Sequence, residues 1–176
     1  MEKQVVIFCA SSQTIDPKYN KAAREVARGL HRKGYGIVSG GTVRGTMGAI
    51  TDESIRCGGA HTAVLPRFME GMENTGASRV LWTDTMSARK ELMRENTVAA
   101  IALPGGIGTL DELMETHTLR KLKKYNGSIY VLNLDGFYNP LKALLDHYVQ
   151  TEMTAKADID LIKFVNTSQE LLENFE

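Results

Sequence analysis

The residue types best suited to chemistry lie in one glycine-rich run, Pro104-Gly105-Gly106-Ile107-Gly108-Thr109-Leu110-Asp111-Glu112. The run follows an apolar segment and precedes a segment in which Leu113, Met114 and Leu119 have helical spacing. Glycines at a strand-to-helix turn let backbone amides approach a ligand, and the positive end of the helix dipole favours an anion. The run therefore predicts a phosphate cradle.

Glu112 lies about one turn inside the expected helix, where phosphate binding alone does not explain a carboxylate. A carboxylate there would repel phosphate, whereas it would stabilise a cation that develops during a reaction. Two interpretations are open. Glu112 is a functional carboxylate, or Thr109 and Glu112 form a capping box in which the Glu side chain bonds the N-cap amide. A capping box does not require the neighbouring glycines, which favours the functional interpretation.

Two further loops follow expected strands. The first contains Ser12, whose hydroxyl could contact a phosphate or ribose, although serine is also a common turn residue. The second runs from Gly40 to Gly48, with Gly41 near its start, and it fits ligand approach and close helix–sheet packing equally well. Neither loop carries GxGxxG or the Lys-Ser/Thr pair of a P-loop, so neither a nicotinamide enzyme nor a P-loop NTPase is indicated.

The elements that must position these loops alternate between apolar, β-branched runs and segments of helical period. That alternation predicts an α/β fold with a mostly parallel sheet flanked by helices. In such a doubly wound sheet, ligands bind beyond the carboxyl ends of the strands, where all three loops lie. The expected strands are Gln4–Ala10, Gly36–Ser39, His61–Leu65, Val80–Trp82, Ala99–Leu103, Ser128–Leu132 and Leu161–Val165.

Three helix starts can be identified from the sequence. Asp16-Pro17 and Asn139-Pro140 each place an N-cap residue before a proline. Thr167 and Glu170 have the spacing of a capping box. The chain shows no internal repeat, no low-complexity tract and no linker, which predicts one domain over residues 1–176.

Composition excludes several classes of protein. The chain has 176 residues, with 21 Lys and Arg against 21 Asp and Glu, and this zero net charge argues against nucleic acid as a partner. No apolar run is long enough to span a membrane, and no signal peptide is evident. Cys9 and Cys57 are expected to be buried free thiols, which predicts a cytoplasmic protein. Scattered histidines and the lack of an identifiable Schiff-base lysine predict no metal and no cofactor.

The run from Pro104 to Glu112 resembles the PGGxGTxxE motif of the LOG family, the cytokinin-activating nucleoside 5′-monophosphate phosphoribohydrolases, which are often labelled lysine decarboxylases. The likeness extends over nearly the whole chain. Phe8–Ser12 is similar to the family's FCGSS, Gly40–Gly48 is similar to its GG…GxMG loop, and Arg89-Lys90 precedes Met93 as in the family.

The resemblance implies a Rossmann-like, homodimeric hydrolase. It would cleave the N-glycosidic bond of a purine nucleoside 5′-monophosphate, AMP or a cytokinin form, to free base and ribose 5-phosphate. Glu112 and Arg89 would be catalytic. The residues expected to bind substrate are Lys90, Gly105, Gly106, Gly108, Thr109 and Asp111, together with Ser12 and Gly41 from the other loops.

Three alternatives stay open beside this hypothesis. One is a sugar-phosphate or cofactor carrier, which would bind phosphorylated ligands that lack a purine. The chain could be a non-catalytic protein that binds a nucleotide or phosphate ligand on the same scaffold, although a pure phosphate binder has no need of Glu112. Without the resemblance, Arg89-Lys90 fits a solvated helix face beside Glu91 and Glu95.

The chain departs from the family pattern at four positions. Ser87 stands where the family commonly has His, and Thr42 stands where it often has a third glycine. Glu95 and Val98 stand where many members have Arg and Asp. These departures bear on base preference and dimer contacts and leave Arg89 and Glu112 unchanged.

Overall fold

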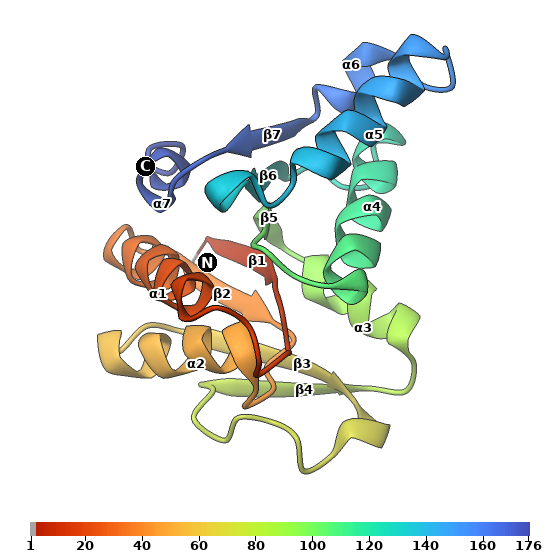
Figure 1. Cartoon of the computed structure of the whole chain (residues 1–176). Coiled ribbons are helices and arrows are strands. Elements are labelled where there is room, and N and C mark those ends of the chain that lie inside the picture. The colour runs from red at the N-terminus through yellow and green to blue at the C-terminus, as the bar shows by residue number, and fades with distance from the viewer. Residues whose placement is uncertain (1–2) are drawn as a thin grey trace.

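Seven parallel strands form one sheet in the order β4-β3-β2-β1-β5-β6-β7 in the computed structural model, which describes residues 3–176 (Figure 1). Every neighbouring pair of strands is parallel. The strands are β1 (Gln4–Phe8), β2 (Gly36–Ser39), β3 (His61–Pro66), β4 (Arg79–Thr83), β5 (Thr97–Ala102), β6 (Ser128–Leu132) and β7 (Ile162–Val165). The prediction of a doubly wound α/β fold is confirmed, with all seven expected strands present.

The first strand ends two residues earlier than expected, at Phe8. Ala10 leaves the sheet because its carbonyl accepts the backbone N–H groups of Thr46 and Met47, at 3.0 and 3.3 Å. Those amides belong to the first turn of the helix Gly45–Cys57, where backbone donors lack partners within the helix. The loop after β1 is thereby joined to the second glycine loop.

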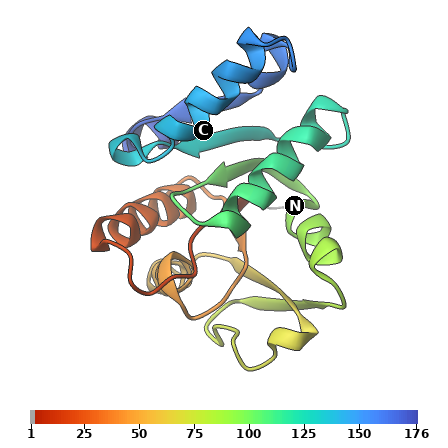
Figure 2. The same ribbon diagram turned by 45° about the vertical axis from the view of Figure 1, so that its right-hand side comes forward.

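Helices cover both faces of the sheet, as Figures 1 and 2 show. One face packs on α1 (Pro17–Arg32), α2 (Gly45–Cys57) and α7 (Ser168–Leu172), and the other on α3 (Met86–Arg94), α4 (Ile107–Lys121) and α5 (Asn139–Gln150). Three short elements complete the order: η1 (Arg67–Met69), η2 (Leu134–Gly136) and α6 (Lys156–Ile159).

Strand β1 lies at the centre of the core. Val5 and Ile7 point to the face covered by α1 and α2, whereas Val6 and Phe8 point to the face covered by α3 and α4. All four side chains are at most 1% exposed, which is why the strand has a continuous apolar sequence.

The strand order reverses beside β1. The chain runs outward through β2, β3 and β4, and then returns to place β5 on the other side of β1. The gap between the carboxyl ends of β1 and β5 is the topological switch point, where ligands of open α/β sheets bind.

The predicted helix starts have mixed outcomes. Asp16 caps α1 by accepting the Lys18 N–H at 2.9 Å, and Thr167 caps α7 by accepting the Glu170 N–H at 3.0 Å, as predicted. The N-cap role predicted for Asn139 is wrong. Tyr138 is the N-cap of α5, and the Asn139 side chain instead accepts a hydrogen bond from Asn133 Nδ2 at 2.9 Å.

The two cysteines differ in their surroundings. Cys9 is a buried free thiol as predicted, but Cys57 is exposed at the C-terminal end of α2, so the prediction that it is buried is wrong. Among residues 3–176, no helix has the length and apolar character needed to cross a membrane.

Candidate active site

A cavity of about 330 Å³ lies at the switch point between β1 and β5. The loop after β1, the second glycine loop, η1, α3 and the start of α4 all contribute to it. Eight of the predicted site residues line it together: Ser12, Arg89, Lys90, Gly106, Gly108, Thr109, Asp111 and Glu112. The topology therefore gathers side chains that are up to a hundred residues apart in the sequence.

Gly105 and Gly41 lie outside this lining. A Cβ on Gly105 would come within 2.1 Å of Thr109 Oγ1, so Gly105 makes room for the first turn of α4. Gly41 has φ +65°, and a Cβ there would come within 2.1 Å of Ala63 Cβ. Close packing against Ala63 therefore explains why position 41 is glycine, and the structure gives no support to a substrate contact by this residue.

Helix α4 begins at the cavity without a side-chain cap. Its N-cap is Gly106, which has open space around its Cβ position and provides no capping side chain. The amides of the first turn and the positive end of the helix dipole therefore face the cavity, which is the geometry of an anion site.

The capping-box interpretation of Glu112 is wrong. Because Gly106 is the N-cap and Ile107 the first helical residue, Thr109 lies inside the helix. The Glu112 carboxylate bonds no N-cap amide but accepts a hydrogen bond from Arg89 NH1 at 3.1 Å.

Arg89 and Glu112 form a buried ion pair between α3 and α4. Each residue is 5% exposed. Arg89 also donates from Nε to the Val64 carbonyl at 2.9 Å, so its guanidinium is held against the end of β3. The solvated-face interpretation of Arg89 is therefore wrong, because tertiary partners on β3 and α4 draw it inward.

Burial raises the pKa of Glu112 from 4.5 to about 7. Arg89 and Lys90 lower this pKa and Asp111 raises it, but desolvation is the largest cause. Near neutral pH the carboxyl therefore exchanges between its acid and its carboxylate, which suits a group that stabilises charge or transfers a proton.

Lys90 lies at the edge of the cavity between two carboxylates of α4. Its Nζ is 2.9 Å from Asp111 Oδ2 and also contacts Glu115. These hydrogen bonds raise the pKa of Lys90, which is a cation at neutral pH. Lys90 thus places a positive charge beside the start of α4.

Sequence reasoning missed an apolar wall of the cavity. Met47, Met69, Met86 and Ile107 line it, from α2, η1, α3 and α4. The i,i+3 spacing of Met86 and Arg89 places both on one helix face, and this spacing could have identified Met86. No signal identifies Met69, which follows β3 in a segment without regular spacing.

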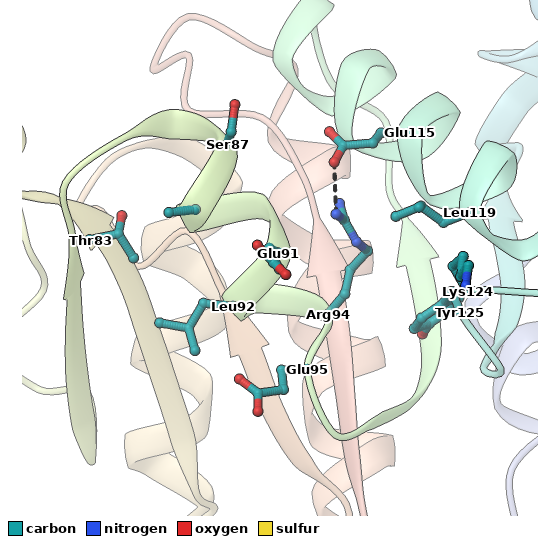
Figure 3. A pocket seen from close by; sticks show the side chains of 11 residues that line it. Thr83, Ser87, Glu91, Leu92, Arg94, Glu95, Glu115, Leu119, Lys124 and Tyr125 are labelled. Carbon is teal, nitrogen blue, oxygen red and sulfur yellow. Dashed lines mark hydrogen bonds and ion pairs between the residues drawn. The ribbon is translucent and has the colours of Figure 1, made fainter.

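A larger groove of about 820 Å³ lies on the outer side of α3, and Figure 3 shows its lining. Arg94 spans it and donates from NH2 to Glu115 Oε1 at 2.7 Å. Arg89, Glu112 and the glycine loop do not line this groove, so we place the candidate active site in the smaller cavity.

Three of the four departures from the family pattern line either the outer groove or the candidate active site. Ser87 and Glu95 line the outer groove, and Thr42 lines the candidate active site. Val98 is 43% exposed on β5. Within the described part of the chain, no group of three or more His, Cys, Asp or Glu side chains could hold a metal ion.

Comparison with known proteins supplies the family. Residues 47–175 match the family described as "Possible lysine decarboxylase". A probable cytokinin riboside 5′-monophosphate phosphoribohydrolase of Oryza sativa, LOGL6, is 34% identical over 99% of this chain and 70% of its own length. The chain belongs to the LOG family. The Arabidopsis thaliana member LOG3, named as a cytokinin riboside 5′-monophosphate phosphoribohydrolase, is 32% identical over 99% of this chain and 82% of its own length.

Solved structures show that other proteins share the fold of this LOG family member. A molybdenum cofactor binding protein from Rippkaea orientalis superposes with a TM-score of 0.76 at 18% identity, over 99% of this chain and 96% of that one. The molybdenum cofactor carrier protein of Chlamydomonas reinhardtii gives the same TM-score at 16% identity, with 99% and 96% covered. At such identity the likeness concerns the fold alone.

Proposed function

We propose that the protein hydrolyses the N-glycosidic bond of a purine nucleoside 5′-monophosphate, AMP or a cytokinin form, to free base and ribose 5-phosphate. The observation that carries the proposal is the buried Arg89–Glu112 pair beside the uncapped start of α4. The names of the LOG relatives support the same reaction class.

The 5′-phosphate would bind at the start of α4. The backbone amides of the first turn would donate hydrogen bonds to the phosphate beside Gly106, Gly108 and Thr109. Ser12 would add a hydroxyl from the loop after β1. Fixing the phosphate orients the ribose toward Glu112, so that binding at one end of the substrate positions the reacting bond.

Cleavage of the bond between base and C1′ develops positive charge on the ribose. The Glu112 carboxylate, in a buried site, stabilises that charge and can orient the attacking water. Water adds its oxygen to C1′, and the departing base nitrogen gains a proton. Arg89 holds Glu112 in place and offers a planar guanidinium to the nucleotide.

The base would lie against the apolar wall formed by Met47, Met69, Met86 and Ile107. Thioether side chains are polarisable and adapt to flat rings and alkyl groups. This wall supports the proposal of a purine base, and an apolar N6 substituent would contact the same side chains.

The deciding experiment is incubation of the purified protein with AMP and chromatographic detection of adenine, with Glu112→Gln beside it. Adenine from the wild type and not from the variant supports the proposal. Adenine from both would remove Glu112 from the mechanism. Binding without hydrolysis across a panel of nucleoside monophosphates would favour the alternative, a nucleotide-binding protein without turnover.

A homodimer and a cytoplasmic location also remain proposals. The outer groove beside α3 and the exposed Val98 support a surface that a second copy could cover. Light scattering coupled to size-exclusion chromatography measures the mass in solution directly, and a monomer at micromolar concentration would contradict the dimer.

A further inference from the structure

Ser39 and His61 form a buried hydrogen bond between β2 and β3, beneath the second glycine loop. The Ser39 hydroxyl oxygen lies 2.9 Å from His61 Nε2 and accepts the Gly41 N–H at 3.2 Å. Ser39 and His61 are 0% and 1% exposed. Burying two polar side chains costs free energy that apolar residues would not cost, so core packing alone does not explain the pair.

The His61 imidazole is neutral, and its side-chain partner is Ser39. Burial and the nearby His31 lower the pKa of His61 to about 4, so its imidazole is neutral at pH 7. The Ser39 oxygen accepts the Gly41 N–H and shares one proton with His61 Nε2. Because His61 Nδ1 has no hydrogen-bond partner among residues 3–176, Ser39 is the side chain that holds the imidazole.

The hydrogen bond from the Gly41 N–H to Ser39 Oγ closes a tight turn at the end of β2. Gly41 takes up φ +65°, where its missing Cβ lets the turn lie directly on Ala63 of β3. The Gly41 carbonyl accepts the Asn74 N–H at 2.8 Å, so the segment after η1 is attached to the same turn.

This turn lies against the Arg89 side chain. A Cβ on Gly40 would be 2.2 Å from Arg89 NH2, so the guanidinium occupies the space that a larger residue would need. Arg89 is bounded on its other sides by the Val64 carbonyl and by Glu112. Ser39 adjoins Gly40 in the chain, and His61 is on the same strand as Val64. Three groups therefore enclose Arg89: the Gly40–Gly41 turn, β3 and Glu112. The Ser39–His61 hydrogen bond joins the first two of them.

We infer that Ser39 and His61 are positioning residues, which hold the Gly40–Gly41 turn and so set the place of the Arg89 guanidinium relative to Glu112. Neither residue lines the cavity, so neither would touch the substrate. The inference deepens the proposed function and rests on it for its rate measurement.

Ser39→Ala tests the inference against a closely matched control, Ser54→Ala. Ser54 lies on α2, away from the cavity lining, and is also 0% exposed. Its Oγ is 2.8 Å from Nε2 of His31 on α1. We expect Ser39→Ala to lower kcat by about 10- to 100-fold and to change KM by less than about threefold, because the phosphate cradle is built by other elements. Ser54→Ala should lower the melting temperature comparably and leave kcat unchanged.

A second measurement does not depend on turnover. The groups that act on the Glu112 carboxyl are Arg89 and Lys90 from α3, Asp111 from α4 and the Cys9 thiol after β1. Because Arg89 lowers the pKa of Glu112, displacement of its guanidinium raises that pKa further. NMR titration of labelled glutamate carboxyls should show this upward shift in Ser39→Ala and not in Ser54→Ala.

The outcomes separate this inference from the proposed function. If the wild type hydrolyses no nucleoside monophosphate, the proposed function fails, and the NMR titration alone decides the inference. Unchanged kcat together with an unchanged Glu112 pKa in Ser39→Ala would overturn it. If Ser39→Ala does not fold, His61→Gln and His61→Leu replace it. Glutamine can keep the bond to Ser39 and should retain more activity than leucine, and equal activity in the two would overturn the inference.

Discussion

Lys90 Nζ lies 2.9 Å from Asp111 Oδ2, so an ion pair at the mouth of the cavity joins α3 to α4 beside the buried pair formed by their chain neighbours, Arg89 and Glu112. Arg89 and Lys90 thus face Glu112 and Asp111 in two layers, one buried and one open to solvent. The buried layer fixes the Glu112 carboxylate, and the outer layer places a cation beside the proposed phosphate position.

Glu112→Gln should retain the fold and nucleotide binding and lower kcat by about 100- to 1,000-fold, because an amide cannot stabilise a developing cation as a carboxylate does. Steady-state kinetics with AMP and isothermal titration with the product ribose 5-phosphate measure the two effects. Glu91→Gln, on the exposed side of α3, is the matched control. An active Glu112→Gln variant would leave this carboxyl with a structural role only.

Removal of Glu112 should also change how stability depends on pH. The folded-state pKa of about 7 lies above the unfolded value of about 4.5, so the folded protein binds more protons between these values. The Glu112 contribution to unfolding free energy therefore falls as pH rises from 4.5 to 7, by on the order of 2 kcal/mol. Urea unfolding at pH 5 and pH 7.5 should show this decline in the wild type and a smaller one in Glu112→Gln. Equal declines in the two proteins would argue against the raised pKa.

Gly108→Ala separates binding from folding. A Cβ on Gly108 meets nothing within 4 Å in the protein, and its φ is not in the left-handed region, so the melting temperature should stay within about 2 °C of the wild type. The added methyl group projects beside the proposed phosphate position, and KM for AMP should rise about tenfold or more. An unchanged KM would show that the phosphate binds elsewhere.

Glu53 provides a stability prediction far from the cavity. It is 3% exposed and lies 2.8 Å from Arg28 Nε, while it also contacts Arg56. Hydrogen bonds from Arg56 and Arg28 lower the pKa of Glu53 to about 2, so its contribution to stability is present above pH 4.5 and is lost as the pH falls through about 2.

Glu53→Gln should therefore lower the melting temperature at pH 7 by about 5 °C and by less at pH 3. Calorimetry at the two pH values measures the difference, and the rate of nucleotide hydrolysis should not change. A loss of stability that is the same at both pH values would assign it to packing and not to charge.

The seven strands could be predicted because strands covered on both faces have uninterrupted apolar sequences, as in Val5–Phe8. The burial of Arg89 could not. Helix α3 has a polar sequence, and only tertiary contacts draw Arg89 inside, with the Val64 carbonyl and with Glu112, 23 residues further along the chain. The capping-box pattern at Thr109 failed for a related reason, since the glycine turn starts the helix earlier than the local pattern indicates.

Met69 marks the other limit of sequence reasoning. Residues 67–78 have no periodicity, and backbone hydrogen bonds to the second glycine loop position them, including Val43 N–H to the Met72 carbonyl at 3.3 Å. Backbone hydrogen bonds of this kind do not depend on side-chain type, so the sequence could not assign Met69 to the apolar wall.

The central place of β1 in the sheet has a consequence for synthesis on the ribosome. β1 pairs with β2 on one side soon after both have been translated, but its other partner, β5, does not begin until Thr97. Until then, the nascent chain exposes an unpaired strand edge with four consecutive apolar residues, Val5–Phe8, which is a template for association with other chains. The same delay postpones the cavity, because the switch point does not exist before β5 is in place. We therefore expect productive folding to begin only when the second half of the chain emerges, and slower translation ahead of Thr97 to increase the demand for chaperones.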